Sequence, residues 1–267
     1  MITKEKFEFY NENGYALFEN IMNHEFCDKY LARIKKHANE EFAAIMNPDR
    51  FEYLVAQTLS NLKEDISLEE KVSMVEECRK TSEMTFEIMA HKEAVQILED
   101  LQQTEVVGLM SQMLYKEANT RYAKQSWHPH QDNIYPRNNN TLKNGFGTQY
   151  LTTNFFLEDA NQDNGSLYIY PGSHKFGLFE AEPNISYREK GDKNPGNKIS
   201  NKVLERFKKI DCEFKKGDLL VLNGNCVHGS YPNNSNKSRP LLSVSYISKG
   251  EDFIAGKNAK RKVIELH

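Results

Sequence analysis

The chain has 267 residues, 39% of them hydrophobic and 27% charged, and its formal net charge is −3. This length suits one large domain with a buried core, and the composition is that of an ordinary globular protein. Acidic and basic residues are mixed along the sequence, which argues against a nucleic-acid-binding face, and no apolar run reaches membrane-spanning length. The first residues lack the pattern of a signal peptide, so we expect a cytoplasmic protein.

The first 105 residues are predicted to be mainly helical. Thr3 is a suitable N-cap for a short first helix, and Asn13-Gly14 predicts a turn into a strand over residues 15–18. Asn23 is placed to cap a longer helix, in which apolar residues recur every four positions. The helices predicted in this region cover residues 3–10, 24–42, 67–80 and 82–102.

The pattern changes after residue 105, where short apolar or alternating runs are separated by Gly, Asn and Pro. Many short strands in one block indicate a β-sandwich or barrel, and helices that precede such a block typically cover one of its sheets. We therefore predict one α+β domain over residues 1–267, with a helical buttress over 1–105 and a β core over 106–267. The strands predicted in the core cover residues 148–157, 166–170, 219–222 and 241–247.

A polar segment that contains Pro and Gly extends over residues 183–202. One interpretation is a solvated surface loop. The other is a mobile lid over a substrate pocket, since long loops in compact domains often have a functional role.

Three side chains form a candidate metal site. His130 and Asp132 are separated by one residue, so in an extended segment both point to the same side and can reach one ion. His228 follows a predicted strand and a tight turn, and it is the candidate for the third ligand. Two His and one carboxylate are the ligand set of non-heme Fe(II) oxygenases, which leave three positions open for a bidentate cosubstrate and O2. His128 with His130 is an alternative pair at the same spacing.

Arg239 is a candidate anchor for a dicarboxylic cosubstrate. It begins the last predicted strand, eleven residues after His228, and antiparallel neighbours joined by a loop of this length would bring the two residues close together. A guanidinium binds a carboxylate through two parallel hydrogen bonds. We therefore expect Arg239 to bind the distal carboxylate of 2-oxoglutarate, with Ser230 adding a hydroxyl group.

The sequence resembles the phytanoyl-CoA dioxygenase family, and the similarity covers nearly the whole chain. Trp127 to Asp132 resembles a W-H-x-D metal segment of that family with two additional residues after the Trp. The other matching segments are FYNENGY at 9–15, NGSLYIYPGSH at 164–174, the HGS triplet at 228–230, and Arg239.

The resemblance implies a double-stranded β-helix, or jelly roll, and an enzyme that uses Fe(II), 2-oxoglutarate and O2 to hydroxylate an unactivated C–H bond, releasing succinate and CO2. Related halogenases replace the metal carboxylate with Gly or Ala. Because Asp132 is present, the resemblance favours hydroxylation over chlorination.

Further site residues are expected around this centre. Gln149 and Asn154 lie on the strand predicted over 148–157, where either side chain can bind 2-oxoglutarate or orient a metal ligand, or face outward. Tyr135, Arg137 and Tyr150 are candidates for substrate contacts.

The substrate is expected to be a small and polar molecule, such as an amino acid, another zwitterion, a phosphonate or a natural-product intermediate. This expectation is based on the mixed surface charge and on Gln131, Asn133 and Arg137 around the metal motif. Two alternatives remain open: a jelly-roll binding protein without turnover, and a cupin-type metal enzyme that does not use 2-oxoglutarate. Neither nucleic acid nor membrane is an expected partner.

Overall fold

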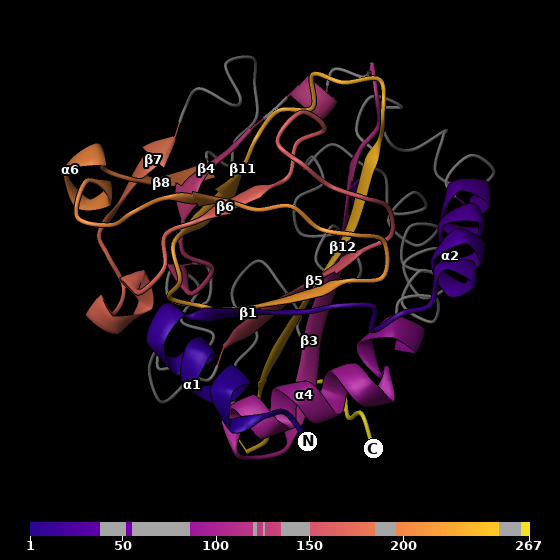
Figure 1. Cartoon of the computed structure of the whole chain (residues 1–267), viewed down its shortest axis with the longest axis horizontal. Helices are drawn as coiled ribbons and strands as arrows, with labels where there is room; N and C mark the ends of the chain where they lie inside the picture. Colours follow the sequence, from indigo (N-terminus) through magenta and orange to yellow (C-terminus); the bar gives the residue numbers. More distant parts are fainter. Residues whose placement is uncertain are drawn as a thin grey trace, which may run out of the picture.

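The protein is a jelly roll of two facing antiparallel sheets, with helices packed on the outer side of the larger sheet (Figure 1). This computed structural model describes residues 1–37, 52–54, 86–119, 122–124, 126–134, 150–184, 196–250 and 263–267. Within these ranges, no helix is long and apolar enough to cross a bilayer. The predicted mainly β core with helices against one sheet is confirmed.

The larger sheet has six strands in the order β1-β10-β5-β12-β3-β2, and every pairing in it is antiparallel. Long apolar stretches form its central strands, which are covered on both faces. Its strands are β1 (Tyr15–Phe18), β2 (Glu52–Leu54), β3 (Val106–Lys116), β5 (Leu151–Phe156), β10 (Leu219–Asn223) and β12 (Arg239–Ser248).

The smaller sheet has four strands in the order β4-β11-β6-β9, and a separate antiparallel pair, β7-β8, lies against β4. In Figure 1 these strands lie on the side of the molecule away from α2 and α4. They are β4 (Trp127–His130), β6 (Leu167–Ile169), β9 (Ile210–Asp211), β11 (His228–Ser230), β7 (Ala181–Asn184) and β8 (Gly196–Ile199).

The predicted helix starts are correct where the structure describes them. The Thr3 hydroxyl accepts a hydrogen bond from the Lys6 amide, and Asn23 Oδ1 accepts one from the Phe26 amide. Gly14 ends the first helix with φ of 79°, a left-handed conformation that glycine adopts without steric cost. The helices are α1 (Lys4–Asn13), α2 (His24–His37), α4 (Lys92–Gln102) and α6 (Asn201–Leu204), with 3-10 turns at η3 (Tyr122–Lys124) and η4 (Ser173–Phe176).

The prediction of one helix over 82–102 is wrong in its described part. Residues 86–89 are helical, but the helix stops there and α4 begins at Lys92. His91 has extended backbone angles, and its ring accepts a hydrogen bond from the Ala94 amide, so it acts as an N-cap within the predicted helix. The helix predicted over 67–80 lies outside the described residues.

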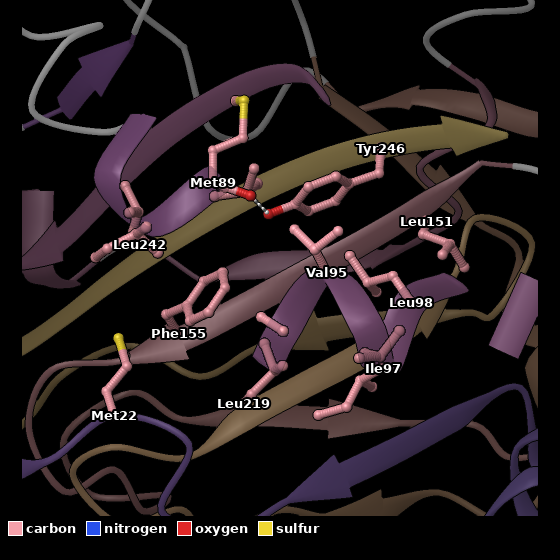
Figure 2. Packing of buried hydrophobic residues seen from close by; sticks show 14 of the residues in the cluster. Met22, Met89, Val95, Ile97, Leu98, Leu151, Phe155, Leu219, Leu242 and Tyr246 are labelled. Carbon is pink, nitrogen blue, oxygen red and sulfur yellow. Dashed lines mark hydrogen bonds between the residues drawn. The ribbon is translucent and has the colours of Figure 1, made fainter. Parts of the chain in front are cut away.

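The core has two layers, one on each face of the larger sheet. On β5, Leu151 and Phe155 point toward the helices, where they meet Leu98 of α4 and Tyr246 of β12 (Figure 2). Phe156, next along the strand, points into the space between the sheets with a second apolar cluster. Because side chains alternate along β5, Leu151 and Phe155 pack against the helices, whereas Phe156 faces the interior of the jelly roll.

The segment 183–202 is not a loop throughout. Its first residues belong to β7 and pair with β8, with Pro183 opposite Asn197, and its last residues begin α6. Residues 185–195, between the two strands, lie outside the described residues. The prediction of an irregular loop is therefore wrong at both ends of the segment, and a lid role stays a prediction.

Candidate metal and cosubstrate site

The three predicted metal ligands converge between the sheets. His130 ends β4 and His228 begins β11, and the two residues lie directly opposite each other in this antiparallel pair. Asp132 follows β4 by two residues. Ligand atoms from the three side chains all lie within 4.8 Å of one another.

The donor atoms are arranged around one point. His130 Nε2 lies 3.4 Å from Asp132 Oδ1, and His228 Nε2 lies 3.7 Å from Asp132 Oδ2. Each imidazole uses its other nitrogen locally, since Nδ1 of His130 is 2.7 Å from His128 O and Nδ1 of His228 is 3.0 Å from Cys226 O. A carbonyl only accepts, so both Nδ1 atoms carry a proton, and both Nε2 atoms face the carboxylate.

Electrostatics keep the carboxylate ionised. Burial alone would raise the pKa of Asp132, but the facing imidazoles of His228 and His130 and the Thr152 hydroxyl together hold it well below its usual range. Burial lowers the pKa of His228 and so favours its neutral form. Two imidazole nitrogens and an ionised carboxylate oxygen form a donor set that fits a divalent transition metal such as Fe(II).

The residues that flank Asp132 lock the metal segment to the turn before His228. Gln131 Nε2 donates to Asn225 O at 2.6 Å and to Gly177 O at 2.8 Å. The Asn133 amide donates to Gly224 O at 2.9 Å, and Asn133 Nδ2 donates to Asn225 Oδ1 at 2.8 Å. Ligands and locking residues thus alternate along 130–133, which fixes two distant segments around one centre. Gln131 and Asn133 were two of the residues from which a polar substrate was expected. Because both side chains form hydrogen bonds within the protein, they no longer support that expectation.

A second cluster contains two buried cations. Lys116 and Arg239 lie opposite each other on β3 and β12, with exposures of 0% and 1%. Lys116 Nζ donates to Ser230 Oγ at 2.9 Å and to Tyr231 O. Burial and the Arg239 charge lower the pKa of Lys116 well below its ordinary value. Two adjacent buried cations with a hydroxyl group are well suited to receive a carboxylate.

The prediction that Arg239 and His228 lie on neighbouring antiparallel strands is wrong. β11 and β12 are not neighbours, because β11 belongs to the smaller sheet and β12 to the larger one. The two sheets face each other instead, and the bond from Lys116 to Ser230 joins them at this point.

Sequence reasoning missed Lys116. The available signal was a lysine that ends the mainly apolar segment 106–115, but β3 was not predicted as a strand. Its pairing with Arg239 therefore could not be seen.

Of the other residues predicted to bind the cosubstrate or the substrate, the structure describes two, Asn154 and Tyr150. Asn154 is 3% exposed on the inner face of β5, and its Nδ2 has no hydrogen-bond partner in the described part of the chain. Tyr150 is buried, and its hydroxyl donates to Ser245 Oγ at 2.8 Å. The three other expected positions, Tyr135, Arg137 and Gln149, lie outside the described residues.

A jelly roll that holds two His and one Asp at a common point, with a cation pair nearby, has the architecture of the non-heme Fe(II) oxygenases. The family model for phytanoyl-CoA dioxygenase matches residues 10–241, and the chain belongs to this family.

Comparisons with individual proteins agree with this assignment. A phytanoyl-CoA dioxygenase of Oryza sativa is 34% identical over 119 residues, which is 45% of this chain and 38% of that protein. A peroxisomal phytanoyl-CoA dioxygenase of Rattus norvegicus is 23% identical over 281 residues, covering 100% of this chain and 76% of that protein. The matches to the first two curated relatives span only 38% and 40% of their lengths.

Solved structures share the fold. The epimerase SnoN, crystallised with Fe3+, alpha ketoglutarate and nogalamycin RO, superposes with a TM-score of 0.67 at 16% identity, over 94% of this chain and 85% of SnoN. The carbocyclase SnoK from nogalamycin biosynthesis superposes with a TM-score of 0.65 at 15% identity, over 99% of this chain and 97% of SnoK. At these identities the likeness concerns the fold.

Proposed function

We propose that the protein is an Fe(II)- and 2-oxoglutarate-dependent dioxygenase that hydroxylates an unactivated C–H bond of a small molecule. The observation that supports this most strongly is the pairing of two sites inside one jelly roll. One is the His130, Asp132 and His228 group, and the other is the Lys116 and Arg239 cation pair. A 2-oxoglutarate molecule has a keto acid that chelates a metal and a second carboxylate that such a cation pair would neutralise.

Each group then has a defined task. His130, Asp132 and His228 would hold the iron, while Lys116 and Arg239 would seat the distal carboxylate. When bound, iron and 2-oxoglutarate together supply the oxidising chemistry, which yields succinate, CO2 and a hydroxylated product. The apolar cluster between the sheets keeps water away from the reacting centre.

The buried side chain of Asn154 is a further observation that supports the proposal. Its Nδ2 faces the interior without a partner among the described residues, and a buried amide donor in that state costs about 1–3 kcal/mol unless a ligand accepts its hydrogen bond. An oxygen of 2-oxoglutarate would satisfy it. Gln149 is proposed for the same task from the same part of the chain.

The substrate class is the finer part of the proposal. Amino acids, other zwitterions, phosphonates and natural-product intermediates are the candidates, with Tyr135, Arg137 and Tyr150 as proposed contacts. Because Gln131 and Asn133 are engaged internally, the preference for a polar molecule depends on Arg137 and on surface charge alone. Cytoplasmic localisation stays a prediction.

The test is succinate formation from 2-oxoglutarate in the presence of Fe(II), measured with and without a panel of these compounds. The proposal expects slow iron-dependent turnover without substrate and stimulation by a panel member. Asp132→Asn should abolish both, whereas Asn23→Ala, which removes only a helix cap, should not. No succinate under any condition would favour a binding protein without turnover. Product formed without 2-oxoglutarate would favour a cupin-type enzyme.

A further inference from the structure

Thr152 contacts one of the proposed metal ligands, although no feature of the sequence singled it out. Its hydroxyl donates a 2.5 Å hydrogen bond to Asp132 Oδ2. Thr152 is 5% exposed, so the bond is shielded from water. A hydrogen bond from a buried hydroxyl to an ionised carboxylate is short and about twice as strong as one between neutral groups.

The backbone holds Thr152 firmly in place. It lies on β5, which is hydrogen-bonded on both sides, with Leu222 of β10 and Ser245 of β12 as its cross-strand partners. Its β-branched side chain restricts rotation about χ1. By contrast, Asp132 lies in a turn after the end of β4, where the backbone alone does not fix a side chain. The rigid strand therefore supplies an orientation that the turn lacks.

We propose that Thr152 is a positioning residue that aims the Asp132 carboxylate at the metal. By engaging Oδ2, its hydroxyl group would leave Oδ1 as the oxygen available to an ion. Asp132 would then fill one coordination position instead of two. This inference rests on the proposed function, because it concerns the ligand set named there.

The number of positions matters for the reaction class. Two His and one carboxylate oxygen leave three of six positions open, which is what a bidentate cosubstrate and O2 require. A second oxygen from Asp132 would take one of the three. Thr152 thus contributes to catalysis by restraining a ligand, without touching a reactant.

Thr153 provides a matched control on the same strand. It is buried, and its hydroxyl donates to Val244 O at 3.0 Å, so it too makes an internal bond. Successive side chains of a strand point to opposite faces, and Thr153 therefore faces the helices while Thr152 faces the metal residues. Replacing either residue with valine removes one buried hydroxyl group and nearly preserves the volume.

The experiment measures Co(II) affinity by titration calorimetry on the full chain. The unmodified protein is compared with Thr152→Val, Thr152→Ser and Thr153→Val, and thermal unfolding is recorded for each. We expect Thr152→Val to weaken Co(II) binding by about 10- to 100-fold, the usual effect of removing a hydrogen bond to a metal ligand. Thr152→Ser keeps the hydroxyl group and should restore most of the affinity. Thr153→Val should bind Co(II) like the unmodified protein even where its thermal midpoint falls.

The outcomes separate this inference from the proposed function. Unchanged Co(II) affinity in Thr152→Val, or an equal loss in Thr153→Val, would overturn the role of Thr152 while the metal site stands. Absence of Co(II) binding by the unmodified protein would overturn the proposed function itself. If Thr152→Val does not fold, Thr152→Ala is compared with Thr153→Ala under the same criteria.

Discussion

Lys116→Met tests the cosubstrate site directly. The substitution keeps an unbranched side chain of similar length at a position that is fully buried, and it removes one of the two cations. It also removes the donor to Ser230 Oγ, which is then left to the cosubstrate. We expect weaker binding of 2-oxoglutarate with little change in metal affinity, since Lys116 contacts none of the three metal ligands in the hydrogen bonds described.

The size of the effect follows from the type of contact. A hydrogen bond to a charged group contributes about 1.5–3 kcal/mol. Since about 1.4 kcal/mol corresponds to a tenfold change in affinity, loss of the Lys116 ammonium should weaken 2-oxoglutarate binding by roughly 10- to 150-fold. The assay is the dependence of succinate formation on 2-oxoglutarate concentration, together with calorimetric titration of Co(II). Lys29→Met, which removes a mostly exposed ammonium on α2, is the matched control.

The same substitution should change the pH dependence of stability. Burial and the Arg239 charge lower the pKa of Lys116 in the folded protein, whereas the unfolded chain keeps the ordinary value near 10.5. Between these two values the folded state binds fewer protons, so the free energy of unfolding rises with pH by at most about 1.4 kcal/mol per pH unit. Below the lowered pKa, the full cost of the buried cation is present. Lys116→Met should remove this rise, as measured by urea unfolding of the cofactor-free protein at several alkaline pH values.

Two results would refute this reasoning. An unchanged requirement for 2-oxoglutarate in Lys116→Met would mean that the cation pair does not seat the cosubstrate. A stability difference between Lys116→Met and the unmodified protein that is constant across the alkaline range would mean that Lys116 titrates normally in the fold.

Two further predictions concern packing. Gly229→Ala should weaken Co(II) binding, because a Cβ there would lie 2.4 Å from the Tyr168 hydroxyl and 2.5 Å from Trp127 O. The backbone would have to shift, and this shift would move the neighbouring His228. An unchanged Co(II) affinity would contradict this prediction. Phe155→Ala should lower the free energy of unfolding by about 3–5 kcal/mol through the cavity left under the helices, measured by urea unfolding, and a loss below 1 kcal/mol would show that the site collapses to fill it.

Local sequence signals predicted those features of the fold that depend on neighbouring residues. Thr3 and Asn23 indicated helix starts because capping needs only a side-chain oxygen near the first amides of a helix. The alternating residues of β5 and β12 indicated strands for a similarly local reason. The break at His91 was missed because the apolar spacing continues through it.

Features that depend on which strands meet could not be predicted in this way. His130 and Asp132 were found because they are close in sequence. His228 was chosen because it follows a predicted strand and a tight turn, and its motif also resembles a family pattern. Thr152 has no such signal and Lys116 has only its place at the end of a mainly apolar segment, since the importance of both arises from the facing of two sheets. Arg239 and His228 are only eleven residues apart, but the strands that carry them belong to different sheets, and sequence separation does not reveal this.

The bond from Lys116 to Ser230 crosses from one sheet to the other, and the bond from Thr152 joins β5 of the larger sheet to Asp132, in the turn that follows β4 of the smaller one. A cosubstrate held at one end by β3 and β12 and at the other by the ion on β4 and β11 would act as a removable tie between the two walls of the sandwich. Loading the protein should therefore slow amide hydrogen exchange in β4 and β11 far more than in β1, which contacts neither end of the tie.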